Sequence, residues 1–188
     1  MLIKGDVKGK AYKDLIDYAF KKCDAAMFVI RKDMYINKHR IDNQSLNELK
    51  NLKNFIETDS GENIIKKRTG NYWVYSKVGN AQVGISEFND PEGYEDFFEI
   101  FFIKTSDKLK KYLLSNNDLY NWLHTKYPED VSFFKNGYCW LYSVAHEELC
   151  YIYCENKEEY EYLKSIGIEF VDTEYKETPQ NELYYEEY

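Results

Sequence analysis

The stretch VSFFKNGYCWLY, residues 131–142, places two apolar runs on either side of an Asn-Gly pair. Asn and Gly both accept the positive φ angles of a two-residue hairpin turn, so this pattern predicts two antiparallel strands joined at Asn136 and Gly137. A further strand is predicted by the apolar run LCYIYC at residues 149–154. This part of the chain therefore indicates a sheet of antiparallel strands.

More strands are predicted upstream of the hairpin. Residues 71–78 are rich in aromatic and β-branched side chains, residues 81–86 alternate with a period of two, and residues 97–103 form the most apolar segment. Short turn segments separate the three, which favours an antiparallel meander. The apolar run at residues 25–30 predicts one buried strand, and residues 168–171 predict a last one.

Helices are predicted between these strands from three-four spacing of apolar residues and from capping residues. They cover approximately residues 12–23, 46–56, 106–113, 117–127 and 157–166. Gly167 ends the last helix in the position where glycine is favoured. We therefore expect the α+β class, with a single domain over residues 1–178, a mostly antiparallel sheet with flanking helices, and an acidic Tyr-rich tail over residues 179–188.

The composition excludes several classes of protein. Of the 188 residues 44% are hydrophobic and 31% are charged, as in ordinary soluble domains, and 18% are aromatic, which excludes a disordered chain. No apolar run approaches the roughly 18 residues of a membrane span, and the start MLIKGD is no signal peptide. We expect a soluble, cytoplasmic protein without a membrane partner.

The negative charge is concentrated in the last quarter of the chain. Residues 1–145 carry 22 basic and 20 acidic side chains, whereas residues 146–188 carry 3 basic and 13 acidic ones. Such a surface repels phosphate backbones, so a nucleic-acid partner is disfavoured. It suits a basic protein, because complementary potentials speed the encounter of two partners. The alternative is that the acidic surface only keeps the protein soluble.

Metal and cofactor motifs are missing from the sequence. The four cysteines are Cys23, Cys139, Cys150 and Cys154, and the three histidines are His39, His124 and His146. Neither set has the close paired spacing of a zinc site, and phosphate-binding loops, nucleophile elbows and EF-hand loops are also absent. We therefore expect reduced thiols, no cofactor and no metal, and only a site assembled by folding would escape this test.

His146 is the leading candidate for chemistry. Glu147 and Glu148 follow it, and adjacent carboxylates favour the charged form of an imidazole, which titrates near neutral pH. If His146 acts as a general base, we expect it to lie in a pocket that binds the substrate. The residues expected to line that pocket are Trp122, Glu129, Asp130, Trp140, Ser143 and His146. The alternative is structural, with His146 ordering a turn through hydrogen bonds.

Tyrosine is the most unusual component, with 19 residues in the chain. Tyr and Trp anchor protein interfaces more often than most residues, and many of these tyrosines alternate with carboxylates near the C-terminal end. The residues expected at an interface are Tyr160, Tyr162, Tyr175, Tyr184, Tyr185, Glu174, Glu186, Glu187 and Trp140. The alternative is that Tyr takes core positions that Phe and Leu fill elsewhere.

Two stretches carry a resemblance to a known family. The first covers residues 5–33 and contains GDV, DYA and MFV; the second covers residues 119–147 and contains YPED, FFKNG and HE. Together they span about a third of the chain. They resemble a family of small soluble proteins of Firmicute-type bacteria that has no assigned function, some of whose members are labelled stage III sporulation AH proteins. The resemblance implies a bacterial or phage setting and supplies no catalytic residue.

The sequence thus leads to one principal hypothesis and two others. The principal hypothesis is a non-enzymatic protein-binding module, of the immunity or inhibitor type, that engages a basic bacterial protein through its acidic Tyr-rich C-terminal surface. The second is a small-molecule sensor or enzyme with a pocket around His146, Glu129 and Trp140. The third is a structural subunit of a larger complex, and homo-oligomer formation stays open.

Overall fold

The computed structural model describes residues 1–31, 64–77, 80–86, 98–123 and 127–177. They form a seven-stranded sheet in the order β3-β2-β4-β1-β5-β6-β7, with every neighbouring pair antiparallel. The strands are β1 Ala25–Arg31, β2 Ile64–Lys77, β3 Asn80–Ser86, β4 Phe98–Lys104, β5 Glu129–Lys135, β6 Tyr138–Val144 and β7 Leu149–Ile152. The helices are α1 Gly9–Lys22, α4 Asp107–Leu113, α5 Lys157–Ser165 and the single turn η3 Ala145–Glu147. The predicted α+β class is confirmed.

The hairpin between β5 and β6 forms at the predicted turn. Asn136 has a φ angle of 50° and Gly137 one of 83°, the positive values that the tight turn requires. The register then shifts by one residue, because Phe133 pairs with Leu141 while Phe134 pairs with Cys139. The extra residue between them is Trp140, which makes a β-bulge.

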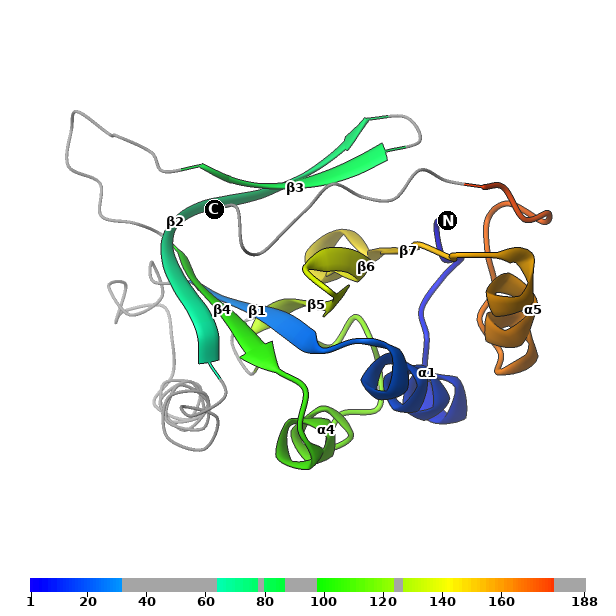
Figure 1. Ribbon diagram of the computed structural model, residues 1–188, viewed down its shortest axis with the longest axis horizontal. Coiled ribbons are helices and arrows are strands. Elements are labelled where there is room, and N and C mark those ends of the chain that lie inside the picture. Colours follow the sequence, from blue (N-terminus) through cyan, green and yellow to red (C-terminus); the bar gives the residue numbers. More distant parts are fainter. Residues whose placement is uncertain (32–63, 78–79, 87–97, 124–126, 178–188) are drawn as a thin grey trace.

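The long strand β2 divides its pairing between two partners. Its first half, residues 64–70, pairs with β4, and its second half, residues 71–77, pairs with β3. The predicted meander is therefore wrong, since β3 and β4 both pair with β2 and β3 lies outermost. Figure 1 shows α1 and α4 on one side of the sheet and the β2–β3 hairpin curving over the other side. The first half of β2 escaped prediction because its sequence, IIKKRTG, is interrupted by three basic residues.

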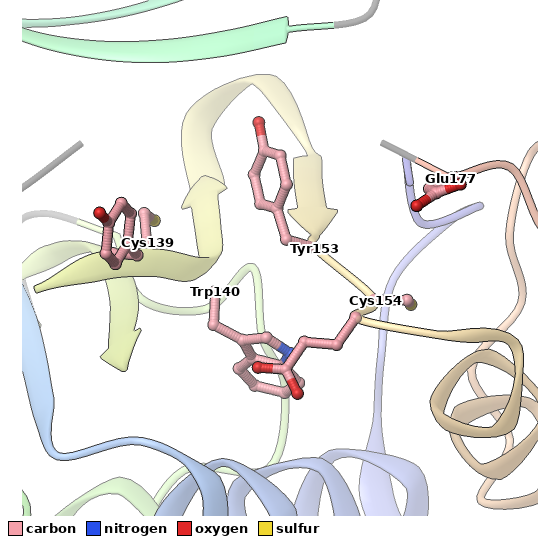
Figure 2. Close-up of a pocket in the computed structure, with 7 residues that line it drawn as sticks. Cys139, Trp140, Tyr153, Cys154 and Glu177 are labelled. Atoms are coloured by element: carbon pink, nitrogen blue, oxygen red, sulfur yellow. The ribbon is translucent and has the colours of Figure 1, made fainter. Parts of the chain in front are cut away.

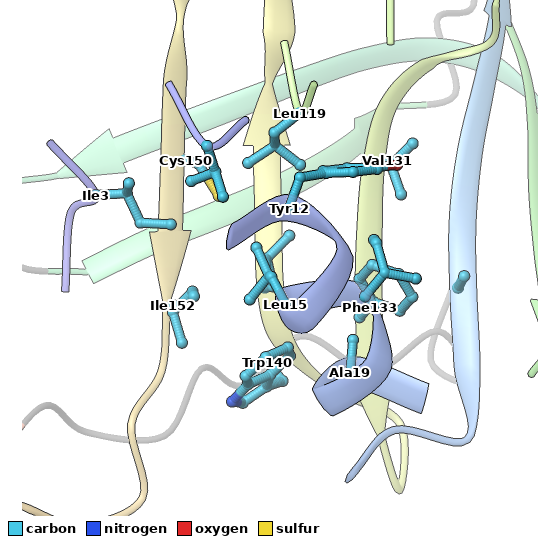
Figure 3. Close-up of a cluster of buried hydrophobic side chains, with 14 of the residues drawn as sticks. Ile3, Tyr12, Leu15, Ala19, Leu119, Val131, Phe133, Trp140, Cys150 and Ile152 are labelled. Carbon is cyan, nitrogen blue, oxygen red and sulfur yellow. The ribbon is translucent and has the colours of Figure 1, made fainter. Parts of the chain in front are cut away.

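The main core lies between α1 and the sheet. The buried face of α1 consists of Tyr12, Leu15, Ile16 and Ala19, at the predicted three-four spacing. Figure 3 shows Leu15 and Ala19 facing the sheet near Trp140 and Phe133. Burial of a side chain such as Leu15 or Ile16 contributes about 1.5–3 kcal/mol of stabilisation relative to exposure. The core therefore fixes the position of α1 over β5, β6 and β7.

A second apolar cluster shows that the sheet is buried on both faces. Phe28 of β1 and Phe101 of β4 belong to the core under the helices, whereas their neighbours Met27 and Phe102 belong to a separate cluster. This alternation follows from the two-residue period of a strand. Continuous apolar runs such as residues 25–30 are the expected sequence of strands buried on both faces.

Two predicted elements are replaced by turns. Residues 117–123 form no helix, because Lys8 and Asp118 make a β-bridge, the Leu119 amide donates to the Val7 carbonyl at 3.0 Å, and the Asp118 side chain accepts from the Tyr120 amide. Residues 168–171 form no strand and contribute a single bridge between Ile3 and Phe170. In both places the backbone forms hydrogen bonds with the N-terminal segment instead of within the predicted element. The predicted helix over residues 46–56 and the tail over residues 179–188 lie outside the described residues.

The N-terminal segment also covers the edge of the sheet at β7. The Ile3 amide donates to the Cys150 carbonyl at 2.8 Å, and the Ile152 amide donates to the Met1 carbonyl at 2.9 Å. On its other side the Val171 amide donates to the Leu2 carbonyl at 3.0 Å. The segment that follows α5 is thereby held against the edge of the sheet. No helix in the described ranges is long and apolar enough to cross a membrane.

Candidate functional site

A buried carboxylate attaches α5 to the rest of the molecule. Oε1 of Glu159 accepts hydrogen bonds from Trp140 Nε1 at 2.9 Å and Tyr18 OH at 3.2 Å, and it lies 2.7 Å from Lys22 Nζ. Its other oxygen, Oε2, accepts from the Glu155 amide at 2.7 Å. Glu159 and the Lys22 side chain are both almost fully buried. A buried ion pair with satisfied oxygens fixes geometry strongly, because any displacement leaves a charge uncompensated.

The sequence around the start of α5 explains why Glu159 points inward. Asn156 is the N-cap, and its side-chain oxygen accepts from the Glu159 amide at 2.8 Å. In the common capping box a Glu at this position reaches back to the amide of the N-cap residue. Here Glu159 reaches one residue further, to the Glu155 amide, which brings its carboxylate over Trp140 and α1.

A pocket of about 320 Å³ opens beside this buried carboxylate. Figure 2 shows it between the end of β7 and the start of β6, with Glu177 at its rim. Its lining consists of Tyr138, Cys139, Trp140, Tyr153, Cys154, Glu155 and Glu177. Burial raises the pKa of the Cys154 thiol to about 12 and that of Cys139 still further, so neither supplies a thiolate nucleophile at neutral pH. Glu155 is already paired with Lys22 at 3.2 Å and Lys135 at 2.7 Å.

The surface around α5 and the segment after it is strongly acidic. Residues 146–177 contain ten acidic and three basic side chains, and Figure 1 shows α5 and the following segment together at one end of the molecule. Four of these carboxylates are exposed and make no ion pair within the described residues: Glu148, Glu158, Glu174 and Glu177. We call these four the free acidic set. Among residues whose exposure is described, the exposed large hydrophobic side chains are Tyr162 at 41% and Val171 at 56%, both in this segment.

The predicted interface residues divide between surface and core. Tyr162 is exposed, Tyr175 is half-buried, and Glu174 is exposed. The prediction is wrong for Tyr160, 1% exposed and packed on Phe170 and Tyr175, and for Trp140, 3% exposed and bonded to Glu159. Both rings fill the core instead of the surface. The positions of Tyr184, Tyr185, Glu186 and Glu187 lie outside the described residues.

The predicted pocket around His146 is only partly assembled. Glu129, Asp130 and His146 each offer a ligand atom, and these atoms lie within 4.8 Å of one another. Ser143 is buried, and its hydroxyl donates to the Val131 carbonyl at 2.9 Å. The indole N–H of Trp122 donates to the Tyr12 hydroxyl at 2.8 Å inside the core, whereas that of Trp140 donates to Glu159 at 2.9 Å.

Sequence reasoning missed Glu159, Lys22 and their shared contacts. The only local signal was the Asn156-x-x-Glu159 spacing of a helix start. Nothing in the sequence indicated that Lys22, at the end of α1, would be its partner. Comparison of the chain with protein-family models, with curated proteins and with solved structures found no match.

Proposed function

We propose that this chain is a non-enzymatic protein-binding module, of the inhibitor or immunity type, that engages a basic bacterial protein through the acidic surface of residues 146–177. The observation that carries this proposal is the free acidic set, four exposed carboxylates without an ion-pair partner among the described residues. Unpaired carboxylates are available to cations of a partner, whereas carboxylates already in salt bridges would have to exchange one lysine for another.

The rigidity of this surface supports the same proposal. The buried contacts of Glu159 tie α5 to α1 and β6, so Glu158, the member of the free acidic set on this helix, is presented in a fixed position. A preorganised surface loses less conformational entropy on binding. Tyr162 is exposed, its ring lies tilted against that of Tyr18 with the centroids 4.7 Å apart, and it supplies an aromatic contact beside the charges. We also propose a cytoplasmic location, which the four free and buried cysteines support because such thiols persist in a reducing compartment.

The test compares two variants with the same number of neutralised charges. The first replaces the free acidic set by Gln, as Glu148→Gln, Glu158→Gln, Glu174→Gln and Glu177→Gln. The matched control replaces four exposed lysines that make no ion pair among the described residues, as Lys13→Gln, Lys21→Gln, Lys104→Gln and Lys111→Gln. Proteins captured from bacterial lysate by wild type and both variants are identified by mass spectrometry, and the affinity of the purified partner is then measured.

We expect a basic partner that wild type and the lysine control retain and the glutamine variant loses. An exposed charge pair contributes about 0.2–1 kcal/mol, so removal of four should weaken binding by about fourfold or more. Added salt should slow association of the wild type and have less effect on the glutamine variant. Equal binding by the glutamine variant, or a partner that is itself acidic, would contradict the proposal.

A further inference from the structure

The group formed by Glu129, Asp130 and His146 joins two separate parts of the sheet. Glu129 and Asp130 are the first residues of β5, and His146 lies in η3, the turn between β6 and β7. One ligand atom from each lies within 4.8 Å of the others. Two donors on one ion with bonds near 2.1 Å lie about 3–4.2 Å apart. The three side chains are therefore already close to the separation that one metal ion imposes.

Backbone geometry holds the two parts of the group together. Asp130 has a φ angle of 57°, a left-handed conformation that is uncommon for a residue other than glycine. Its Oδ1 accepts a hydrogen bond from the Ala145 amide at 2.8 Å, and Ala145 immediately precedes His146. A hydrogen bond thus connects the start of β5 directly to the η3 turn. The Ser143 hydroxyl adds a second connection through the Val131 carbonyl at 2.9 Å.

Burial distinguishes these carboxylates from the exposed acidic residues elsewhere on the surface. Glu129 is 7% exposed and Asp130 is 1% exposed, whereas His146 is exposed. Burial removes most of the hydration of both carboxylates, and a divalent cation beside them compensates the charge of both at once. The exposed imidazole leaves one side of the group accessible, through which an ion can enter.

We propose that Glu129, Asp130 and His146 bind a divalent transition-metal ion of the manganese, iron or zinc class. Carboxylate oxygens suit hard cations, while an imidazole nitrogen favours transition metals over Mg²⁺ and Ca²⁺. No thiolate belongs to the group, which separates it from structural zinc sites rich in cysteine. Three protein ligands leave coordination positions for water or for a donor group of a bound molecule. Glu147, whose Oε1 lies 3.8 Å from His146 Nε2, adds a further negative charge beside the group.

The test uses the full chain after treatment with a chelator. Calorimetric titrations with MnCl₂, ZnCl₂, MgCl₂ and CaCl₂ are carried out on wild type, His146→Gln, Glu129→Gln and Asp107→Asn. His146 is exposed, so its replacement leaves the core unchanged, and circular dichroism checks that each variant is folded. Asp107, an exposed carboxylate on α4 outside the group, serves as the control.

We expect one Mn²⁺ or Zn²⁺ per chain in wild type and in Asp107→Asn. Loss of a ligand in His146→Gln or Glu129→Gln should weaken the affinity by about tenfold or more, since even outer-shell changes cost about 10–100-fold. Binding unaffected by His146→Gln would place the ion elsewhere and overturn the proposal. No binding of Mn²⁺ or Zn²⁺, or binding of Mg²⁺ and Ca²⁺ alone, would overturn it as well.

Discussion

The indole N–H of Trp140 donates to Oε1 of Glu159 at 2.9 Å, and both side chains are buried. This contact joins the β-bulge of β6 to the first turn of α5. Because Trp140 is the extra residue of the bulge, its ring lies on the helix side of the sheet together with the side chain of its neighbour Leu141. A residue expected at the surface is therefore part of the attachment of the acidic helix.

Replacement of Glu159 by Gln should destabilise the fold by about 2–3 kcal/mol. The change removes the charge that compensates the nearly buried Lys22, whose remaining ion-pair partner among the described residues is Glu155, at 3.2 Å. Urea unfolding followed by circular dichroism measures the effect. The control Glu158→Gln changes an exposed neighbour and should stay within about 0.5 kcal/mol of wild type. If the two variants unfold alike, Glu159 does not anchor α5.

Replacement of Tyr12 by Phe should destabilise the fold by about 1–3 kcal/mol. The Tyr12 hydroxyl donates to the Leu113 carbonyl at 2.9 Å and accepts from Trp122 Nε1 at 2.8 Å, so its loss leaves two buried groups without that partner. The same unfolding measurement applies. Tyr162→Phe, at an exposed position, is the matched control and should cost less than about 0.5 kcal/mol. A cost no larger than that of the control would show that water replaces the hydroxyl.

The geometry of the hairpin turn predicts that two substitutions at adjacent positions differ in their effect on stability. Gly137→Ala places a Cβ at a φ angle of 83° and should cost about 1–2 kcal/mol. Asn136→Gly, at a φ angle of 50°, removes a Cβ from a similar conformation and should change stability by less than about 0.5 kcal/mol. Thermal unfolding of both variants checks this. A larger loss in Asn136→Gly than in Gly137→Ala would contradict it.

The buried thiols should make stability fall at alkaline pH. Burial raises the pKa of Cys154 to about 12 and raises the pKa values of Cys23, Cys139 and Cys150 as well. A raised folded-state pKa gives stability that is fully present below the unfolded value, near 9, and is lost as the pH rises above it. Urea unfolding between pH 7 and pH 10.5 should show this loss, and replacement of Cys154 by Ala should reduce it.

Reaction with a thiol reagent gives an independent measurement of the same property. At pH 8 the native chain should react far more slowly than the chain unfolded in urea, because thiolates are the reactive species and these thiols are buried and protonated. Fast reaction of the native protein would show that at least one thiol is accessible.

Much of the fold was predictable because its signals are local. The turn at Asn136 and Gly137, the apolar face of α1 and the end of α5 at Gly167, whose φ angle is 95°, all depend on neighbours within a few residues. Such signals act through backbone conformation and helical or strand periodicity. They do not depend on which distant segment packs against the element.

Strand order and the candidate sites depended on distant contacts. Residues 117–123 have the apolar spacing of a helix. Their backbone nevertheless pairs with Val7 and Lys8, more than a hundred residues away in the sequence. The group of Glu129, Asp130 and His146 forms only because β6 returns the chain to the start of β5. Nothing local encodes either pairing.

Two tyrosines of α5 show the division between the two kinds of information. The sequence alone determined that Tyr160 and Tyr162 lie on one amphipathic helix, about 200° apart around its axis. Only the tertiary structure decided that Tyr160 is buried against Phe170 while Tyr162 is 41% exposed on Tyr18. The physical reason is that helical periodicity separates the two faces of α5, whereas docking against the rest of the molecule selects the face that is buried.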